Sequence, residues 1–388
     1  MPCSFAVNAV DGAARAGVLT TPHGAVRTPA FMPVGTLGAV KGVPPAQLAD
    51  LGAEVLLCNL YHLALRPGVD AIEALGGLHA WNGWSGPILT DSGGFQIFSL
   101  GHLRQVDDEG VTFRSHLDGA AVRLTPEEVV DLQRRLGVDV AMVLDECPPW
   151  PVSAEEATAS LARTTRWAAR ARERWARAPG PGALFGIVQG SAFRPLRERA
   201  AGELADLQFD GYAIGGVSVG EPDAERRAAV EWTAPLLPAD RPRYLMGVGY
   251  RRDIVHAVTC GIDLFDCVLP ARNARHGVLF TRQGELRLKG AAFRGDPRPV
   301  EEGCPCPCCR QISRAFLHHL LRWDELTGKV LATLHNLRFY LDFMAEVRQS
   351  IAAGTLAELA SHLVSQGKSQ GKSQPDGDSR ADPVIVSV

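Results

Sequence analysis

Long apolar runs are absent from this sequence. No stretch approaches the roughly 18 consecutive apolar residues of a transmembrane helix. The N-terminal residues MPCSFAVNAVDGAARAG also lack the basic start and following apolar stretch of a secretory signal. We therefore expect a globular, cytoplasmic protein that does not associate with membranes.

Cysteine is scarce as well, with nine residues in a chain of 388. Thiols this few and this unevenly spread exclude a secreted disulfide scaffold, which is usually small and dense in cysteine. Four of them lie close together in the stretch GCPCPCCRQ at 303–311. A metal site or a reactive thiol accounts for this cluster better than disulfides do.

Net charge is low, because 40 Lys and Arg oppose 43 Asp and Glu and leave −3. That balance argues against a general nucleic-acid binder, but the segment 271–314 is locally basic. Its nine basic residues are Arg272, Arg275, Arg282, Arg287, Lys289, Arg294, Arg298, Arg310 and Arg314, and its four acids are Glu285, Asp296, Glu301 and Glu302. The local excess indicates either a solvated face or a phosphate-binding patch.

Eight short apolar runs have the length of buried parallel strands. They lie at 31–36, 53–59, 87–94, 138–146, 183–190, 210–216, 243–249 and 262–270. Helix-like segments separate most of them, one with Thr125 as N-cap before Pro126 and another starting at Ser153. Eight strands alternating with helices over roughly 250 residues predict a (β/α)8 TIM barrel, an α/β fold. A doubly wound open sheet is the competing fold.

The C-terminal segment 365–388 differs from the rest of the chain. It repeats GKSQ, is polar and has few side chains that could form a core. We expect a disordered tail there. Residues 1–364 then form a single catalytic barrel domain.

Polar residues and glycines stand at the C-terminal ends of the predicted strands, where TIM barrels carry their chemistry. They are Asn59, Asp91, Asp145, Gln189, Gly215, Gly216, Gly247 and Asp266. Any one of them could simply end a strand or start a turn. Three carboxylates on one rim are harder to explain this way, because like charges in a cleft cost stability unless they are used.

These residue types suit chemistry on a glycosidic bond. Two carboxylates beside a sugar carbon can displace a base, one as nucleophile and one as proton shuttle. A third, ionised carboxylate accepts hydrogen bonds only, so it suits the N–H and amino edge of guanine. A glutamine amide and a backbone N–H can donate to the guanine carbonyl, and this combination selects guanine over adenine.

Nine motifs, in order along the chain, resemble those of the tRNA-guanine transglycosylase family, over about residues 5 to 360. They are DSGGFQIFSL (91–100), VLDEC (143–147), GIVQG (186–190), AIGGVSVGE (213–221), YLMGVGY (244–250), DLFDCVLPAR (263–272), CPCPCC (304–309), SRAFLHHL (313–320) and LHNLRFY (334–340). The resemblance implies exchange of the wobble guanine of GUN-anticodon tRNAs for 7-aminomethyl-7-deazaguanine (preQ1), a step of queuosine biosynthesis. The reaction passes through a covalent Asp–ribose intermediate.

The resemblance also implies roles for individual residues. Asp266 matches the nucleophile, and Asp91 matches the general acid/base. The residues that match the base site are Asp145, Gln189 and Gly216 for the purine edge, Phe95 and Met246 for stacking on the flipped base, and Val217 with its supporting Glu221 for the aminomethyl group. Those that match RNA contacts are Arg272, Arg275 and Lys41. Val219, in a position that is glycine in queuine-using enzymes, predicts the smaller preQ1 base.

The cysteine cluster matches the family's structural zinc site, C-x-C-x₂-C followed 26 residues later by histidine. Cys304, Cys306, Cys309 and His335 fit this pattern, in a zinc-binding subdomain at about 290–340. Cys308 in place of Cys309 is an alternative register. The rival histidines His318 and His319 fall too early for the spacing.

The family also forms homodimers, so we expect a homodimer here. We expect Cys147 to form a wall of the base pocket.

Two other functional classes stay open. One is a zinc-dependent barrel hydrolase that uses Asp91, Asp145 and Asp266 as metal ligands. The other is a non-catalytic RNA-binding homologue, although both catalytic aspartates are present.

Overall fold

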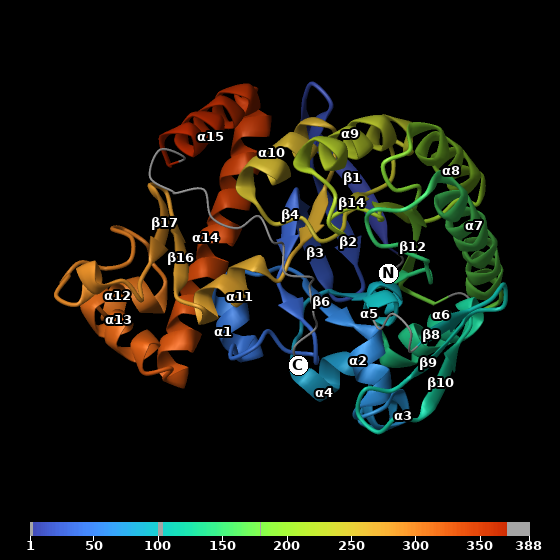
Figure 1. Ribbon diagram of the computed structural model, residues 1–388, viewed down its shortest axis with the longest axis horizontal. Helices are drawn as coiled ribbons and strands as arrows, with labels where there is room; N and C mark the ends of the chain where they lie inside the picture. The colour runs from blue at the N-terminus through green and yellow to red at the C-terminus, as the bar shows by residue number, and fades with distance from the viewer. Residues whose placement is uncertain (1–2, 100–103, 179, 371–388) are drawn as a thin grey trace.

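The computed structural model describes residues 3–99, 104–178 and 180–370. Its centre is a barrel of parallel strands (Figure 1). The barrel strands are β4 Ala30–Met32 with β5 Val34–Gly35, β6 Leu56–Asn59, β7 Ile88–Asp91, β11 Val140–Met142, β12 Ala183–Val188, β13 Gly211–Ile214, β14 Arg243–Leu245 and β15 Leu264–Asp266. All eight predicted strand positions are confirmed.

The barrel closes through its first strand, which Pro33 divides into β4 and β5. β4 pairs in parallel with β15, and β5 pairs in parallel with β6, so the two ends of the sheet meet in one strand. The remaining neighbours follow chain order. Closure confirms the TIM barrel and shows that the open-sheet alternative is wrong.

Helices follow the barrel strands, and several of the longer ones pack an apolar stripe against them. They are α1 Pro45–Asp50, α2 Leu60–Leu65, α3 Val69–Ala74, α4 Leu78–Asn82, α5 Gly94–Ser99, α6 Pro126–Leu136, α7 Ala154–Arg177, α8 Arg194–Asp206, α9 Asp223–Thr233 with η2 Ala234–Leu236, and α10 Arg251–Thr259. Thr125 and Ser153 begin α6 and α7, as predicted, and the structure shows a capping box at each.

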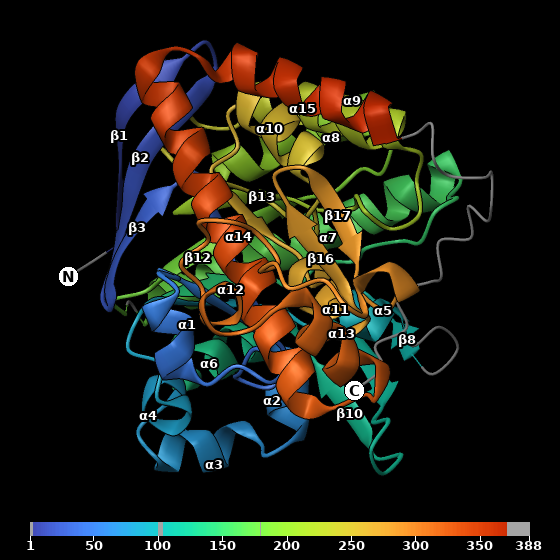
Figure 2. The same ribbon diagram turned by 90° about the vertical axis from the view of Figure 1, so that its left-hand side faces the viewer.

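An antiparallel sheet closes the N-terminal end of the barrel. Its strands are β1 Ser4–Asp11, β2 Ala14–Thr21 and β3 Gly24–Thr28 (Figure 2, blue). Arg15 pairs with Asp263, and His23 pairs with Asp139. Because both aspartates directly precede barrel strands, the sheet lies on the face opposite the strand ends that carry the candidate site.

Two further units extend from the barrel. One is the antiparallel sheet of β8 Arg104–Val106, β9 Val111–Arg114 and β10 Ala121–Leu124. The other follows β15 and appears in orange at the left of Figure 1. It comprises α11 Leu269–Arg275, β16 Val278–Thr281, β17 Gly284–Arg287, η3 Ala291–Phe293, α12 Pro307–Gln311 and α13 Arg314–Arg322.

The long helix α14 (Leu326–Ala353) joins this C-terminal unit to the barrel, since it contacts α11, α12 and α13 as well as β1, β2 and β4. Helix α15 (Leu356–Gln370) follows and includes the first residues of the expected tail. The rest of that tail, 371–388, lies outside the described residues. No helix within the described part of the chain has the length and apolarity needed to cross a membrane.

Candidate active site and metal centre

Asp91 ends β7 in a dense set of hydrogen-bond donors. Its Oδ1 accepts from the backbone N–H of Leu60 at 3.1 Å, and its Oδ2 accepts from the amides of Asn59 and of Gln96, the latter at 3.0 Å. Burial raises the pKa of Asp91 to about 7. The hydrogen bonds oppose this rise, and the negative charge of Asp266 adds a smaller contribution to it. A carboxyl group with this pKa can both give and take a proton at neutral pH.

Asp266 ends β15 and has one oxygen held and one free. Oδ1 accepts from the Tyr244 hydroxyl at 2.6 Å and from the Gly247 N–H at 2.8 Å. Within the described chain Oδ2 accepts no hydrogen bond. Burial raises the pKa of Asp266, and the two donors oppose that rise. The fixed Oδ1 orients the carboxylate and leaves Oδ2 available as a nucleophile.

Asp145 and Gln189 form a buried pair beyond the ends of β11 and β12. Gln189 Nε2 donates to Asp145 Oδ2 at 2.6 Å, and the Ser92 hydroxyl donates to Oδ1 at 3.3 Å. Burial raises the pKa of Asp145 to about 6, against these hydrogen bonds. Gln189 Oε1 is buried and has no partner among the described residues. The pair therefore retains hydrogen-bonding capacity that a polar ligand could fill.

Glycine at 216 lets the chain after β13 approach this pair. A Cβ built at Gly216 would lie 2.3 Å from Gln189 Oε1, and the residue has a φ of +63°. A side chain there would both clash and strain the backbone. The backbone of Gly216 is thus within reach of any group bound at Gln189.

Arg197, on α8, holds this glycine turn through hydrogen bonds to its backbone carbonyls. Its side chain is fully buried, and its Nη2 donates to the carbonyl oxygens of Gly215 at 3.0 Å and Gly216 at 3.1 Å. Its Nε donates to the Ser191 carbonyl. The sequence analysis missed Arg197, because an arginine in a charged helix is normally solvent-exposed.

Replacing Arg197 with lysine should destabilise the protein by about 3 kcal/mol, because one ammonium nitrogen cannot occupy both the Nε and the Nη2 positions and leaves buried carbonyls unpaired. Urea unfolding measures the change. Arg199→Lys on the same helix is the matched control: Arg199 pairs at the surface with Glu203, so its loss should cost less than about 0.5 kcal/mol. Equal effects of the two substitutions would contradict the assigned role of Arg197.

Glu221 holds the segment that follows the glycine turn. Its carboxylate accepts from the N–H groups of Ser218 and of Val219, the latter at 2.9 Å. Because a trans peptide directs its N–H and C=O to opposite sides, the Val217 carbonyl points away from Glu221. Glu221 therefore fixes the peptide group to which the Val217 carbonyl belongs.

The predicted stacking residues lie on opposite sides of the barrel rim. Phe95 belongs to α5 after β7 and is 37% exposed, which is high for an aromatic ring. Met246 directly follows β14 and is half-buried. Cys147 is buried, and burial raises the pKa of its thiol to about 12, so it is not a nucleophilic thiolate at neutral pH.

Basic side chains lie where the C-terminal unit joins the barrel. Arg272 and Arg275 lie on α11, directly after the strand that carries Asp266. Burial and then the charges of these two arginines lower the pKa of His276. Lys41 is exposed, and its neighbour Gly42 lies against Val330 of α14. The basic segment thus borders the rim, where a polyanion could bind.

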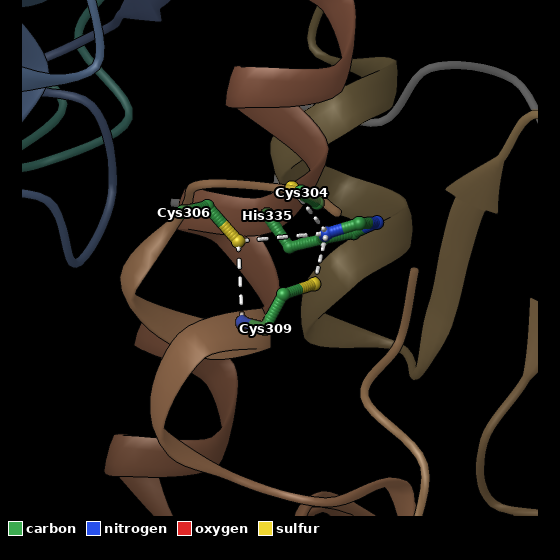
Figure 3. Close-up of side chains that lie close together, drawn as sticks. All are labelled: Cys304, Cys306, Cys309 and His335. Atoms are coloured by element: carbon green, nitrogen blue, oxygen red, sulfur yellow. Dashed lines mark hydrogen bonds between the residues drawn. The ribbon is translucent and has the colours of Figure 1, made fainter. Parts of the chain in front are cut away.

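The cysteine cluster has the geometry of a metal centre. His335 Nδ1 lies 3.8 Å from Cys304 Sγ, 3.6 Å from Cys306 Sγ and 3.3 Å from Cys309 Sγ (Figure 3). Tetrahedral zinc separates its sulfur and nitrogen ligands by about 3.6 Å. His335 Nε2 faces the Phe280 carbonyl at 2.7 Å. A hydrogen bond there fixes the tautomer that leaves Nδ1 free to bind a metal.

The competing ligands lie elsewhere. Cys308 is fully buried and does not belong to the ligand group. His318 Nδ1 faces the Leu288 carbonyl at 2.6 Å, and His319 stacks on Phe316. The four predicted ligand residues therefore form the cluster, and they fit a structural zinc.

Asp91 should make stability fall as the pH rises. Its pKa is about 7 in the folded protein against an ordinary value of 3.8, so between about pH 4 and 7 the folded state holds a proton that the unfolded state has lost. We expect the free energy of unfolding to decrease over this interval, and Asp91→Asn to flatten the decrease. Urea unfolding from pH 5 to 8 tests this. Asp240→Asn, at an exposed site, is the control, and an unchanged slope for Asp91→Asn would contradict the prediction.

Fold and site together define a (β/α)8-barrel enzyme with carboxylate chemistry on its rim and a separate Cys₃His centre. A family model described as queuine tRNA-ribosyltransferase matches residues 11–369. The chain is 53% identical over 351 residues to the queuine tRNA-ribosyltransferase of Thiobacillus denitrificans, covering 90% of this chain and 95% of that protein. It is 54% identical over 352 residues to that of Aromatoleum aromaticum, covering 91% and 95%. The chain belongs to the queuine tRNA-ribosyltransferase family.

Membership confirms the resemblance predicted from the motifs and the assignment to the pentosyltransferases. It disfavours the hydrolase alternative, and so does the geometry. Among the described residues, Asp91, Asp145 and Asp266 do not form a group with ligand atoms within 4.8 Å of one another.

Proposed function

We propose that this enzyme exchanges the wobble guanine of GUN-anticodon tRNAs for preQ1 and so acts in queuosine biosynthesis. One observation carries the proposal: three carboxylates share the barrel rim, Asp145 buried and the other two half-buried, and each has a different set of hydrogen-bond partners. A nucleophile, a proton shuttle and a base reader need these different environments.

Asp266 is the proposed nucleophile. Its Oδ2 attacks ribose C1′ as the bond between C1′ and the guanine nitrogen breaks, and an ester joins the protein to the RNA. The Tyr244 hydroxyl and the Gly247 N–H hold Oδ1 and so orient the attacking oxygen. Asp91 protonates the departing guanine. It then removes a proton from the incoming base, which attacks C1′ and releases Asp266.

Base recognition falls to the buried pair and the glycine turn. Asp145 accepts from the N–H and amino groups of guanine, while Gln189 and the Gly216 N–H donate to its carbonyl. Phe95 and Met246 stack on the two faces of the flipped base. The Val217 carbonyl accepts from the aminomethyl group of preQ1, and Val219 leaves too little space for queuine.

The tRNA backbone is proposed to bind Arg272, Arg275 and Lys41, because guanidinium and ammonium groups neutralise phosphates. Zinc bound by the Cys₃His cluster would supply structure only, since four protein ligands leave no open position. We also propose that the protein forms a homodimer. The exposed Phe316 and Trp323, on and directly after α13 of the same C-terminal unit, support it.

Incorporation of radiolabelled guanine into a GUN-anticodon tRNA tests the proposed activity. We expect exchange into this tRNA and none into a matched transcript with adenine at the wobble position. Unlabelled preQ1 should chase the label from the tRNA, and queuine should not. Absence of exchange by the folded, zinc-loaded protein would overturn the proposal and favour an RNA-binding homologue.

A further inference from the structure

Helix α14 places two buried polar side chains, Asn336 and Tyr340, beside the segments that flank the proposed nucleophile. The helix packs along α11, the element that follows the nucleophile strand β15 (Figure 1). Asn336 and Tyr340 are four residues apart, so they share one face of α14. Both are fully buried, and each polar group therefore needs a partner within the protein.

Tyr340 holds the turn that follows β14. Its hydroxyl donates to the Gly249 carbonyl at 2.7 Å, and this hydrogen bond is buried. Burial raises the pKa of Tyr340, so the hydroxyl stays protonated and remains a donor. The ring packs on Phe31 of β4 and on Phe280 of β16, with centroid distances of 4.9 and 5.4 Å. Two neighbouring rings and one hydrogen bond thus fix Gly249 relative to the barrel.

The same turn supplies a donor to the nucleophile. Two residues before Gly249, the Gly247 N–H donates to Asp266 Oδ1 at 2.8 Å. Gly249 also packs closely on the residue after the nucleophile, because a Cβ built at Gly249 would lie 2.7 Å from the Cβ of Cys267. A glycine allows this close approach of the two segments. A shift of the turn would therefore move the Gly247 N–H away from Asp266.

Asn336 holds the chain on the other side of the nucleophile. Its Nδ2 donates to the carbonyl oxygens of Pro270 and Val278, both at 3.0 Å, and its Oδ1 accepts from the Phe280 N–H at 3.0 Å. Pro270 lies in the first turn of α11, four residues after Asp266. One face of α14 thus anchors both the segment after β14 and the segment after β15.

We propose that Tyr340 is a positioning residue for the nucleophile. Its hydroxyl keeps the turn 247–250 in the place from which the Gly247 N–H fixes Asp266 Oδ1, and this contact leaves Oδ2 directed at the ribose. The inference rests on the proposed function, in which Asp266 attacks C1′. A displacement of about 1 Å at a reacting group can slow a reaction about 100-fold, so even a small movement of the turn would reduce the rate.

Tyr340→Phe tests the proposal, because it removes only the hydroxyl and keeps the packed ring. We expect kcat for guanine incorporation to fall at least tenfold, while KM for the tRNA changes less than twofold. Val347→Ala is the matched control, at a fully buried residue two turns further along α14. It should lower the melting temperature and keep the parental kcat. An equal loss of kcat in the two variants would overturn the proposal.

Hydrogen–deuterium exchange supplies a readout that does not depend on activity. The Gly247 N–H lies at the surface, so its protection comes from the hydrogen bond to Asp266. Peptides with this amide should take up deuterium at least tenfold faster in Tyr340→Phe than in the parent protein or in Val347→Ala. Unchanged protection of this amide, or an unchanged kcat, in Tyr340→Phe would overturn the proposal. Absence of guanine incorporation by the parent protein would overturn the proposed function instead, and the amide measurement would still decide whether Tyr340 holds the turn.

Discussion

Replacing Asp266 with asparagine should eliminate the covalent protein–RNA adduct and reduce guanine exchange by about 10⁴-fold or more. Asparagine keeps the shape of the side chain, and its carbonyl can still accept from Tyr244 and Gly247. It lacks the anionic oxygen that attacks C1′. Trapping with tRNA on a denaturing gel and radiolabelled guanine exchange measure the two effects.

Cys267→Ala is the matched control, because this thiol adjoins Asp266 and is the other nucleophilic group at the end of β15. Burial raises the pKa of Cys267 to about 12, so it is not a thiolate at neutral pH. The alanine variant should still form the adduct. An adduct at parental yield in Asp266→Asn would place the nucleophile elsewhere.

Replacing Cys309 with alanine should release the cysteine-bound metal and destabilise the C-terminal unit strongly. Structural zinc contributes binding free energies on the order of 10 kcal/mol to small domains, and much of that is lost with one of four ligands. The affected unit includes α12 and adjoins α14, so the loss should spread to the barrel. Metal content and thermal unfolding together measure the effect.

Cys308→Ala is the matched control at the neighbouring position. Cys308 is fully buried but outside the ligand group, so its replacement should leave the metal in place and cost about 1 kcal/mol for the lost packing. The opposite result, with metal lost from Cys308→Ala and kept in Cys309→Ala, would establish the alternative register.

The barrel strands could be predicted because their signal is local. A strand buried on both faces must be a short apolar run, and β12, with all six residues buried, shows this directly. Helix starts at Thr125 and Ser153 were equally clear, since an N-cap residue and its first helical neighbours form a local signal. The match to the family's ligand pattern predicted the set Cys304, Cys306, Cys309 and His335, and the structure brings these residues together.

No local sequence pattern predicted the contacts between distant parts of the chain. Arg197 looks like a surface residue until β13 brings the Gly215 carbonyl to its guanidinium. His23 and Asp139 are 116 positions apart and meet because the N-terminal sheet closes the barrel end. The distinction between Cys308 and Cys309 depends on which way each side chain leaves α12. Local sequence specifies the strands, caps and candidate ligands, whereas barrel closure places distant side chains together and sets the environment that tunes each carboxylate.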